Sequence, residues 1–138
     1  MVLIVSTSGR LGWSLEQRTD VLALDDGLKP DMASLNLGPV MFLKHSNVDS
    51  LSLIEEIAVR MVGRGIKPEL EVFDFGSVNV AHHLIRKGLI CPPYYFNLIL
   101  GNLASAQAKL GQLASIVSQL PPEAIWSVGG IGRTLGLT

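Results

Sequence analysis

The sequence has a single cysteine, Cys91, among its 138 residues. One cysteine excludes a disulfide within the chain and a metal site built from several cysteines. We therefore expect a reducing, cytoplasmic setting, where disulfides are rare.

The sequence also has no excess of basic residues, because its 11 Lys and Arg are balanced by 12 Asp and Glu. Without a basic surface we expect no nucleic acid partner.

A long apolar run is missing as well. No stretch reaches the roughly eighteen uncharged apolar residues that a membrane-spanning helix needs, so we expect no membrane association. The apolar start, residues 1–5, is short and has no basic segment before it, so it is not expected to be a signal peptide. With 48% hydrophobic and 17% charged residues, the composition is typical of a globular protein. The length suits one domain, which we place at 1–138.

Strand-like and helix-like patterns alternate along the chain. Short apolar or alternating runs predict strands at 2–6, 32–35, 69–74, 94–100 and 124–128. Apolar residues at three- and four-residue steps, together with capping signals, predict helices at 14–24, 48–63, 78–87 and 105–119. Residues 39–47 are predicted to be irregular. Because the strands recur at about the length of one βα unit, we expect parallel strands joined by right-handed crossovers.

The predicted strand at 69–74 is unusual because it carries two glutamates. Glu69, Glu71 and Phe73 share one face, and the residues between them share the other. A parallel strand between helices is usually apolar on both faces. A lone buried carboxylate costs several kcal/mol or more, so these two must be paired, protonated or in use. The pattern indicates a strand that lines a polar cavity.

Polar residues collect where the predicted strands end, and in parallel α/β folds the active site forms at that edge. They are Ser6 to Ser8, Ser34, Asn36, Glu71, Asp74, Gly101, Asn102, Gly129, Gly130 and Arg133. Two architectures fit this pattern: an open, doubly wound sheet of five strands, or part of an eight-stranded barrel. The polar strand at 69–74 favours the barrel, whose strands turn alternate side chains inward.

Four segments in this order carry a resemblance to a known family. They are Ser6-Thr-Ser-Gly9, the stretch Lys-Pro-Asp-Met-Ala-Ser-Leu-Asn at 29–36, Lys-Pro-Glu-Leu-Glu-Val-Phe-Asp at 67–74, and Trp-Ser-Val-Gly-Gly-Ile-Gly-Arg at 126–133. Together they resemble the β-keto acid cleavage enzymes, of which 3-keto-5-aminohexanoate cleavage enzyme is one. The resemblance covers nearly the whole chain.

The resemblance implies a TIM barrel, of which this chain would form about five parallel strands, the third to the seventh, with four crossover helices. It implies that a β-keto acid and acetyl-CoA react to give acetoacetate and a new CoA ester. It also implies a divalent metal, usually zinc, that polarises the keto acid, with acetyl-CoA as co-substrate. Lewis-acid stabilisation of an enolate suits that reaction. A homo-oligomer is expected.

The resemblance also implies roles for particular residues. Glu71 falls on the catalytic glutamate of the fifth strand. Ser6 and Ser34 fall on hydroxyl residues that bind substrate after the third and fourth strands, and Asn36 and Arg133 fall near the mouth of the site.

The chain departs from the family at the metal site. The family's His-x-His and its metal-binding glutamate lie on strands that this sequence does not match, so no metal ligand is assigned in this chain. We therefore expect the chain to be inactive by itself. The alternative that remains open is a small, non-catalytic α/β ligand-binding domain with an open five-stranded sheet.

Overall fold

The computed structural model describes residues 1–9, 13–38, 40–42, 45–47 and 50–131. Its main sheet has five strands: β1 (Ile4–Val5), β2 (Met32–Asn36), β5 (Lys67–Val72), β6 (Tyr95–Leu100) and β7 (Ile125–Gly130). They lie side by side in that order, and every neighbouring pair is parallel. The predicted alternation of strands and helices is confirmed.

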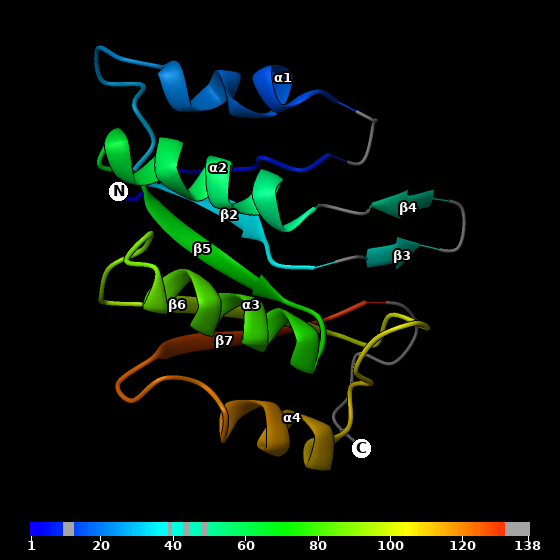
Figure 1. Cartoon of the computed structure of the whole chain (residues 1–138). Helices are drawn as coiled ribbons and strands as arrows, with labels where there is room; N and C mark the ends of the chain where they lie inside the picture. The colour runs from blue at the N-terminus through cyan, green and yellow to red at the C-terminus, as the bar shows by residue number, and fades with distance from the viewer. Residues whose placement is uncertain (10–12, 39, 43–44, 48–49, 132–138) are drawn as a thin grey trace.

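Four helical connections join the strands (Figure 1). They are α1 (Leu15–Thr19) continued by the 3-10 helix η1 (Asp20–Ala23), then α2 (Leu51–Gly63), α3 (Phe75–Arg86) and α4 (Leu110–Val117). Each new strand is added on the same side of the previous one, so right-handed crossovers all lie on one face of the sheet. A doubly wound sheet would instead reverse its strand order at one point. The arrangement is therefore that of a partial barrel.

The hydrophobic core lies between the sheet and these helices. In β5 and β6, buried residues alternate with half-buried ones. The buried set faces the helices, and it includes Leu70, Val72, Phe96 and Leu98, each at most 1% exposed. The opposite set includes Glu69 and Glu71, which are half-buried. The predicted two-faced strand is confirmed as far as Val72: one face packs in the core and the other faces a polar, partly open surface. Its predicted end at residue 74 is wrong, because Phe73 is buried at 4% exposed and Asp74 caps the next helix.

Two helices end in the same way. At the end of α2, Gly65 has a φ of +67°, its N–H donates to Val62 O, and the N–H of Ile66 donates to Met61 O. At the end of α3, Gly88 has a φ of +68° and closes the corresponding pair of bonds with Leu89. This is the Schellman motif, in which a glycine adopts the left-handed conformation. It turns the chain back toward the next strand.

Several predicted boundaries are wrong, and two of the differences are large. Residues 39–47 were expected to be irregular, but β3 (Val40–Phe42) and β4 (His45–Asn47) pair antiparallel. The helix expected at 105–119 begins only at Leu110. Before that helix, the N–H of Ala106 donates to Phe73 O, and Gln107 bonds to Asn102 and Ser105. One bond to distant backbone and two bonds within the loop thus take the place of the first helical turn.

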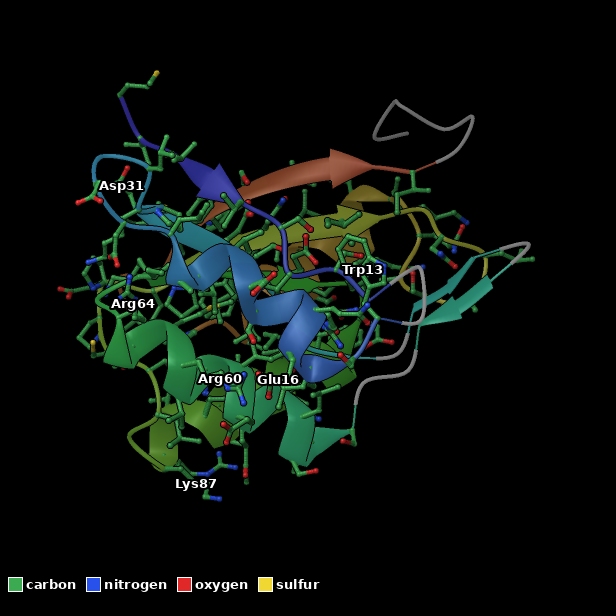
Figure 2. The ribbon with its side chains drawn as sticks, turned by 90° about the horizontal axis from the view of Figure 1, so that it is seen from above. Trp13, Glu16, Asp31, Arg60, Arg64 and Lys87 are labelled. Atoms are coloured by element: carbon green, nitrogen blue, oxygen red, sulfur yellow. The ribbon has the colours of Figure 1, made fainter. Side chains whose placement is uncertain are left out.

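The segment that contains α1 is fastened to α2 by two arginines. The Arg60 guanidinium donates to both carboxylate oxygens of Glu16 at 2.9 and 3.2 Å and to the Thr19 hydroxyl at 2.8 Å. Arg64 donates to Leu22 O and to the Asp25 carboxylate. Figure 2 shows the side chains of Glu16 and Arg60 pointing toward each other.

Among the described residues, no helix is long and apolar enough to cross a membrane.

The start of α3 depends on a carboxylate cap, Asp74, whose Oδ1 accepts the N–H of Ser77 at 3.1 Å. Replacing Asp74 with Ala is expected to lower the free energy of unfolding by about 0.5–2 kcal/mol, because the first helical turn loses its acceptor. Urea unfolding measures this loss. Asp74→Asn is the control, since its carbonyl oxygen can still cap the helix. Equal stability of the two variants would contradict the assignment.

An ion-pair cluster between α2 and α3 predicts an acid-sensitive contribution to stability. His83 lies 2.6 Å and Lys87 3.0 Å from the same oxygen of Glu55. The hydrogen bond from His83, and then that from Lys87, lowers the pKa of the Glu55 carboxyl. A lowered folded-state pKa stabilises the fold above the ordinary carboxyl pKa, and this gain is lost as the pH falls through the folded value.

The test compares the wild type with Glu55→Gln in urea unfolding at neutral pH and at pH values below the ordinary carboxyl pKa. The wild type is expected to be the more stable at neutral pH, and the difference should shrink in acid. A difference that stays constant over that range would contradict the linkage.

Candidate active site

A polar row crosses the sheet from the carboxyl ends of β2 and β5 to the middle of β6 and β7. The strand register places Asn36 opposite Glu71, Glu71 opposite Asn97, and Asn97 opposite Ser127. Neighbouring residues in register lie close enough for their side chains to interact. Two of the residues predicted for the site, Asn36 and Glu71, are thus brought together. Asn97 and Ser127 join them from strands where the sequence analysis proposed no site residue.

A second row lies one step toward the amino ends of the strands. Glu69 accepts a hydrogen bond from the Asn97 carboxamide at 3.2 Å. Tyr95 and Ser127 share a hydrogen bond of 2.8 Å between their hydroxyls, and Ser127 reaches the Asn97 oxygen at 3.5 Å. Asn97 therefore links the two rows. The alternation within β6 puts Tyr95 and Asn97 on one face. Which residues of β5 and β7 they bond to is seen only from the pairing of these strands with β6.

The predicted hydroxyl residues meet at the end of β1. The Ser34 hydroxyl lies 3.4 Å from that of Ser6 and accepts the backbone N–H of Thr7 at 3.2 Å. The Thr7 hydroxyl donates to Ser34 O at 2.6 Å. Ser34 is 6% exposed, whereas Ser6 is exposed. The structure therefore brings Ser6 and Ser34 together, with Ser6 on the open side.

A buried arginine donates a hydrogen bond to the backbone of this loop. Arg18, on α1, is 3% exposed, and its Nε donates to the backbone oxygen of Thr7 at 2.8 Å. The sequence analysis did not single out Arg18, because an arginine in an amphipathic helix is usually at the surface. Its burial indicates that α1 helps to set the position of the Ser6 to Ser8 loop.

Asn36 has a structural bond as well as its place in the row. Its carboxamide oxygen accepts the N–H of Gly38 at 3.0 Å, which closes a tight turn after β2. Asn36 is 6% exposed. The fifth predicted site residue, Arg133, lies outside the described residues.

Among the described residues, no group of three or more His, Cys, Asp or Glu side chains could hold a metal ion. The donor set in the polar rows consists mainly of hydroxyls, carboxamides and single carboxylates. The described part of the chain therefore does not fit a metal centre by itself.

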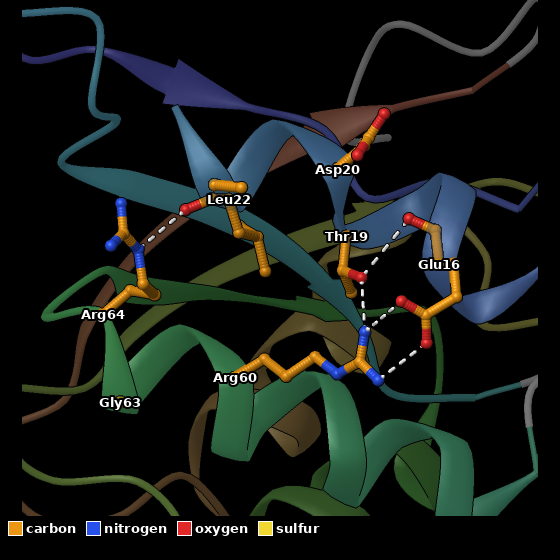
Figure 3. A pocket seen from close by; sticks show the side chains of 8 residues that line it. Glu16, Thr19, Asp20, Leu22, Arg60, Gly63 and Arg64 are labelled. Atoms are coloured by element: carbon orange, nitrogen blue, oxygen red, sulfur yellow. Dashed lines mark hydrogen bonds and ion pairs between the residues drawn. The ribbon is translucent and has the colours of Figure 1, made fainter. Parts of the chain in front are cut away.

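The outer surface has a hollow of about 400 Å³ between η1 and α2 (Figure 3). Its lining includes Glu16, Thr19, Arg60 and Arg64. The hydrogen bonds drawn in Figure 3 occupy Arg60 with Glu16 and Thr19, and Arg64 with Leu22 O. The hollow lies on the helical side of the sheet, away from the polar rows, and its arginines fasten one helix to the other.

The order of the strands, the one-sided crossovers and the polar carboxyl edge define the chain as part of a (β/α)8 barrel. Solved structures of ObcA share this fold. One of them, "Ternary complex of ObcA with C4-CoA adduct and oxalate", superposes with a TM-score of 0.75 at 19% identity. The superposition covers 94% of this chain and 36% of the ObcA chain. The apo structure of ObcA gives the same TM-score.

The chain belongs to the beta-keto acid cleavage enzyme family, whose model matches residues 1–135. It is 33% identical over 129 residues to the 3-keto-5-aminohexanoate cleavage enzyme of Acetoanaerobium sticklandii. This match covers 93% of this chain and 46% of that protein. It is also 33% identical over 132 residues to the 3-oxoadipate:acetyl-CoA acetyltransferase of Cupriavidus necator. That match covers 94% of this chain and 45% of the relative. The chain thus spans about half the length of these relatives.

Proposed function

We propose that this chain supplies one wall of the active site of an enzyme that transfers acyl groups between a β-keto acid and acetyl-CoA. The products would be acetoacetate and a new CoA ester. The observation that carries the proposal is the row of Asn36, Glu71, Asn97 and Ser127 across a partial barrel, which begins at the carboxyl ends of β2 and β5. Barrel enzymes bind their substrates at the carboxyl edge of the strands. The names of the relatives from Acetoanaerobium and Cupriavidus support the class of reaction.

Each predicted site residue has a chemical role in this proposal. The Glu71 carboxylate takes a proton from the carbon next to the keto group, and that carbon bonds to the acetyl carbon of acetyl-CoA as the C–S bond of the thioester breaks. The released CoA thiolate then takes the acyl group as the original carbon–carbon bond breaks, and Glu71 returns the proton to the acetoacetate carbon. The hydroxyls of Ser6 and Ser34, with the Asn36 carboxamide, donate hydrogen bonds to the oxygens of the β-keto acid. Arg133 supplies a positive charge for an anionic group of a substrate. We also propose that residues 1–138 form one domain of a cytoplasmic homo-oligomer.

The positions of these groups support the roles. Glu71 is half-buried, so it can contact a ligand in the concave face while staying partly shielded from water. Ser34 is held by the loop that Arg18 supports. Ligands for the metal implied by the family would have to come from outside the described residues, which hold no group of three or more His, Cys, Asp or Glu side chains that could bind it.

A chimera tests the proposal. The stretch of the Acetoanaerobium relative that matches this chain is replaced by this chain, and acetoacetate formation from acetyl-CoA is measured. The β-keto acids supplied are 3-keto-5-aminohexanoate and 3-oxoadipate. We expect turnover with at least one of them, and none from the isolated chain.

A second chimera, carrying the matching stretch of the Cupriavidus relative, controls for the design. If that chimera is active while the chimera with this chain folds cooperatively but turns over neither β-keto acid, the proposed function is wrong. Turnover by the isolated chain would leave the reaction class intact but refute the expectation that this chain is inactive alone.

A further inference from the structure

The hydrogen bonds around Asn97 on the concave face have a fixed direction. Asn97 Nδ2 donates to the Glu69 carboxylate at 3.2 Å, and the Ser127 hydroxyl donates to Asn97 Oδ1 at 3.5 Å. A carboxylate can only accept, so the nitrogen of the carboxamide must face Glu69 and its oxygen must face Ser127. Since the single hydroxyl proton of Ser127 goes to Asn97, the Tyr95 hydroxyl, 2.8 Å away, donates to Ser127. The orientation of the Asn97 carboxamide is therefore set from both of its ends.

This orientation leaves one donor of Asn97 open. A carboxamide nitrogen carries two N–H groups, and Glu69 accepts one of them. In the part of the chain that the structure describes, the second N–H donates to no residue. Asn97 is half-buried, and a shielded donor without a protein acceptor bonds to water or to a ligand. The second N–H is thus available to a ligand on the concave face.

The open N–H lies beside the proposed general base. Asn97 is in register with Glu71, and the alternation of burial along β5 and β6 puts both side chains on the concave face. Neighbouring strands lie about 4.8 Å apart, so one small molecule can contact both residues. A β-keto acid whose C–H points to Glu71 therefore has its keto oxygen, which is bonded to the next carbon, within reach of Asn97.

We propose that Asn97 is a catalytic residue that donates its second N–H to the keto oxygen of the β-keto acid. This inference rests on the proposed function, because it adds a residue to the same site. When Glu71 takes the proton, the C–H bond breaks and its electron pair moves onto the keto oxygen, which becomes an enolate oxygen. A donor that is already in place stabilises this developing charge more than it stabilises the neutral ketone. Glu69 and Ser127 are positioning residues, because they act by holding the carboxamide.

The kinetic test uses the chimera that carries this chain within the Acetoanaerobium relative. Asn97→Ala should lower kcat by about 10²–10³-fold, the range for loss of one oxyanion donor, with a much smaller change in KM. Ser127→Ala keeps the N–H but removes the bond to the carboxamide oxygen, so kcat should fall only about threefold to tenfold, as for one neutral hydrogen bond. Asn79→Ala is the matched control, because Asn79 is exposed on α3, and it should leave kcat unchanged.

A second measurement requires no turnover. The chimera is prepared with isotopically labelled asparagine, and its carboxamide signals are recorded by NMR with and without acetoacetate as the probe β-keto acid. Asn97→Gln identifies the two N–H signals of Asn97, because it removes them while keeping a carboxamide at this position. We expect acetoacetate to shift the N–H signal that is not bonded to Glu69 and to leave the other nearly in place.

The inference and the proposed function fail separately. A wild-type kcat for Asn97→Ala, in a chimera that turns over its substrates, would overturn the role of Asn97 and leave the function in place. An acetoacetate titration that moves neither Asn97 signal would overturn that role as well, whether or not the chimera is active. A chimera without turnover, in which acetoacetate still shifts the one signal, counts against the function and supports the contact between Asn97 and the keto oxygen.

Discussion

Glu71→Gln in the active chimera is expected to lower kcat by about 10²–10⁴-fold, the range for loss of a general acid or base. Gln keeps the shape of the side chain but cannot take up a proton. Glu71 lies between Asn36 and Asn97 in register, so an isosteric amide is accommodated next to either carboxamide. The expected loss is therefore one of chemistry rather than of folding.

Two further measurements separate a catalytic role from a structural one. The pH profile of kcat/KM should lose the limb that reports the carboxylate, and the free energy of unfolding should stay within about 1 kcal/mol of the wild type. Glu56→Gln is the control, because Glu56 lies on α2 and bonds Arg60 on the outer surface. Wild-type turnover by Glu71→Gln would refute the assignment. A loss confined to KM would limit Glu71 to substrate binding.

Phe96→Ala is expected to lower the free energy of unfolding by about 3–5 kcal/mol, through lost transfer energy and the cavity left behind. Phe96 is 0% exposed and lies on β6, between Leu70 of β5 and Trp126 of β7. A strand at this position has neighbours on both sides, so the cavity cannot collapse easily. Since small domains are stable by only about 5–15 kcal/mol, the loss is a large share of the total.

Urea unfolding of the isolated chain measures this loss. Phe75→Ala is the matched control, because Phe75 is 39% exposed at the first turn of α3, and a change below about 1 kcal/mol is expected. Where Phe96→Ala no longer folds, Phe96→Leu provides a smaller and measurable loss. A loss below about 1 kcal/mol for Phe96→Ala would mean that this face of β6 is not the core.

The Glu69 and Glu71 pattern shows how local information predicts a site. Alternation is a local property with a period of two residues, so it correctly divided this strand into a polar and an apolar face. The hydroxyls near Ser6 and Ser34 followed from the rule that active sites form at the carboxyl edge of parallel strands. Asn97 was missed because its importance depends on which residues lie opposite it.

Other misses have the same cause. Nothing local marks residues 40–42 and 45–47 as paired strands, since three residues are too few to show a period. The late start of α4 depends on the bond from Ala106 to Phe73 O, which joins residues far apart in the sequence. The burial of Arg18 goes with its bond to the backbone oxygen of Thr7, on a separate segment of the chain. Each case depends on a contact between distant segments.

By itself, the sequence determined the succession of strands and helices, the two-faced strand of Glu69 and Glu71, and the family. These depend on periodicity and on short motifs, which are properties of neighbouring residues. Only the tertiary structure decided the strand register, and therefore the row of Asn36, Glu71, Asn97 and Ser127. It also decided that Trp126 and Val128 remain half exposed at an edge. Register and exposure are set by hydrogen bonds and packing between segments that are distant in the chain, and no local pattern encodes them.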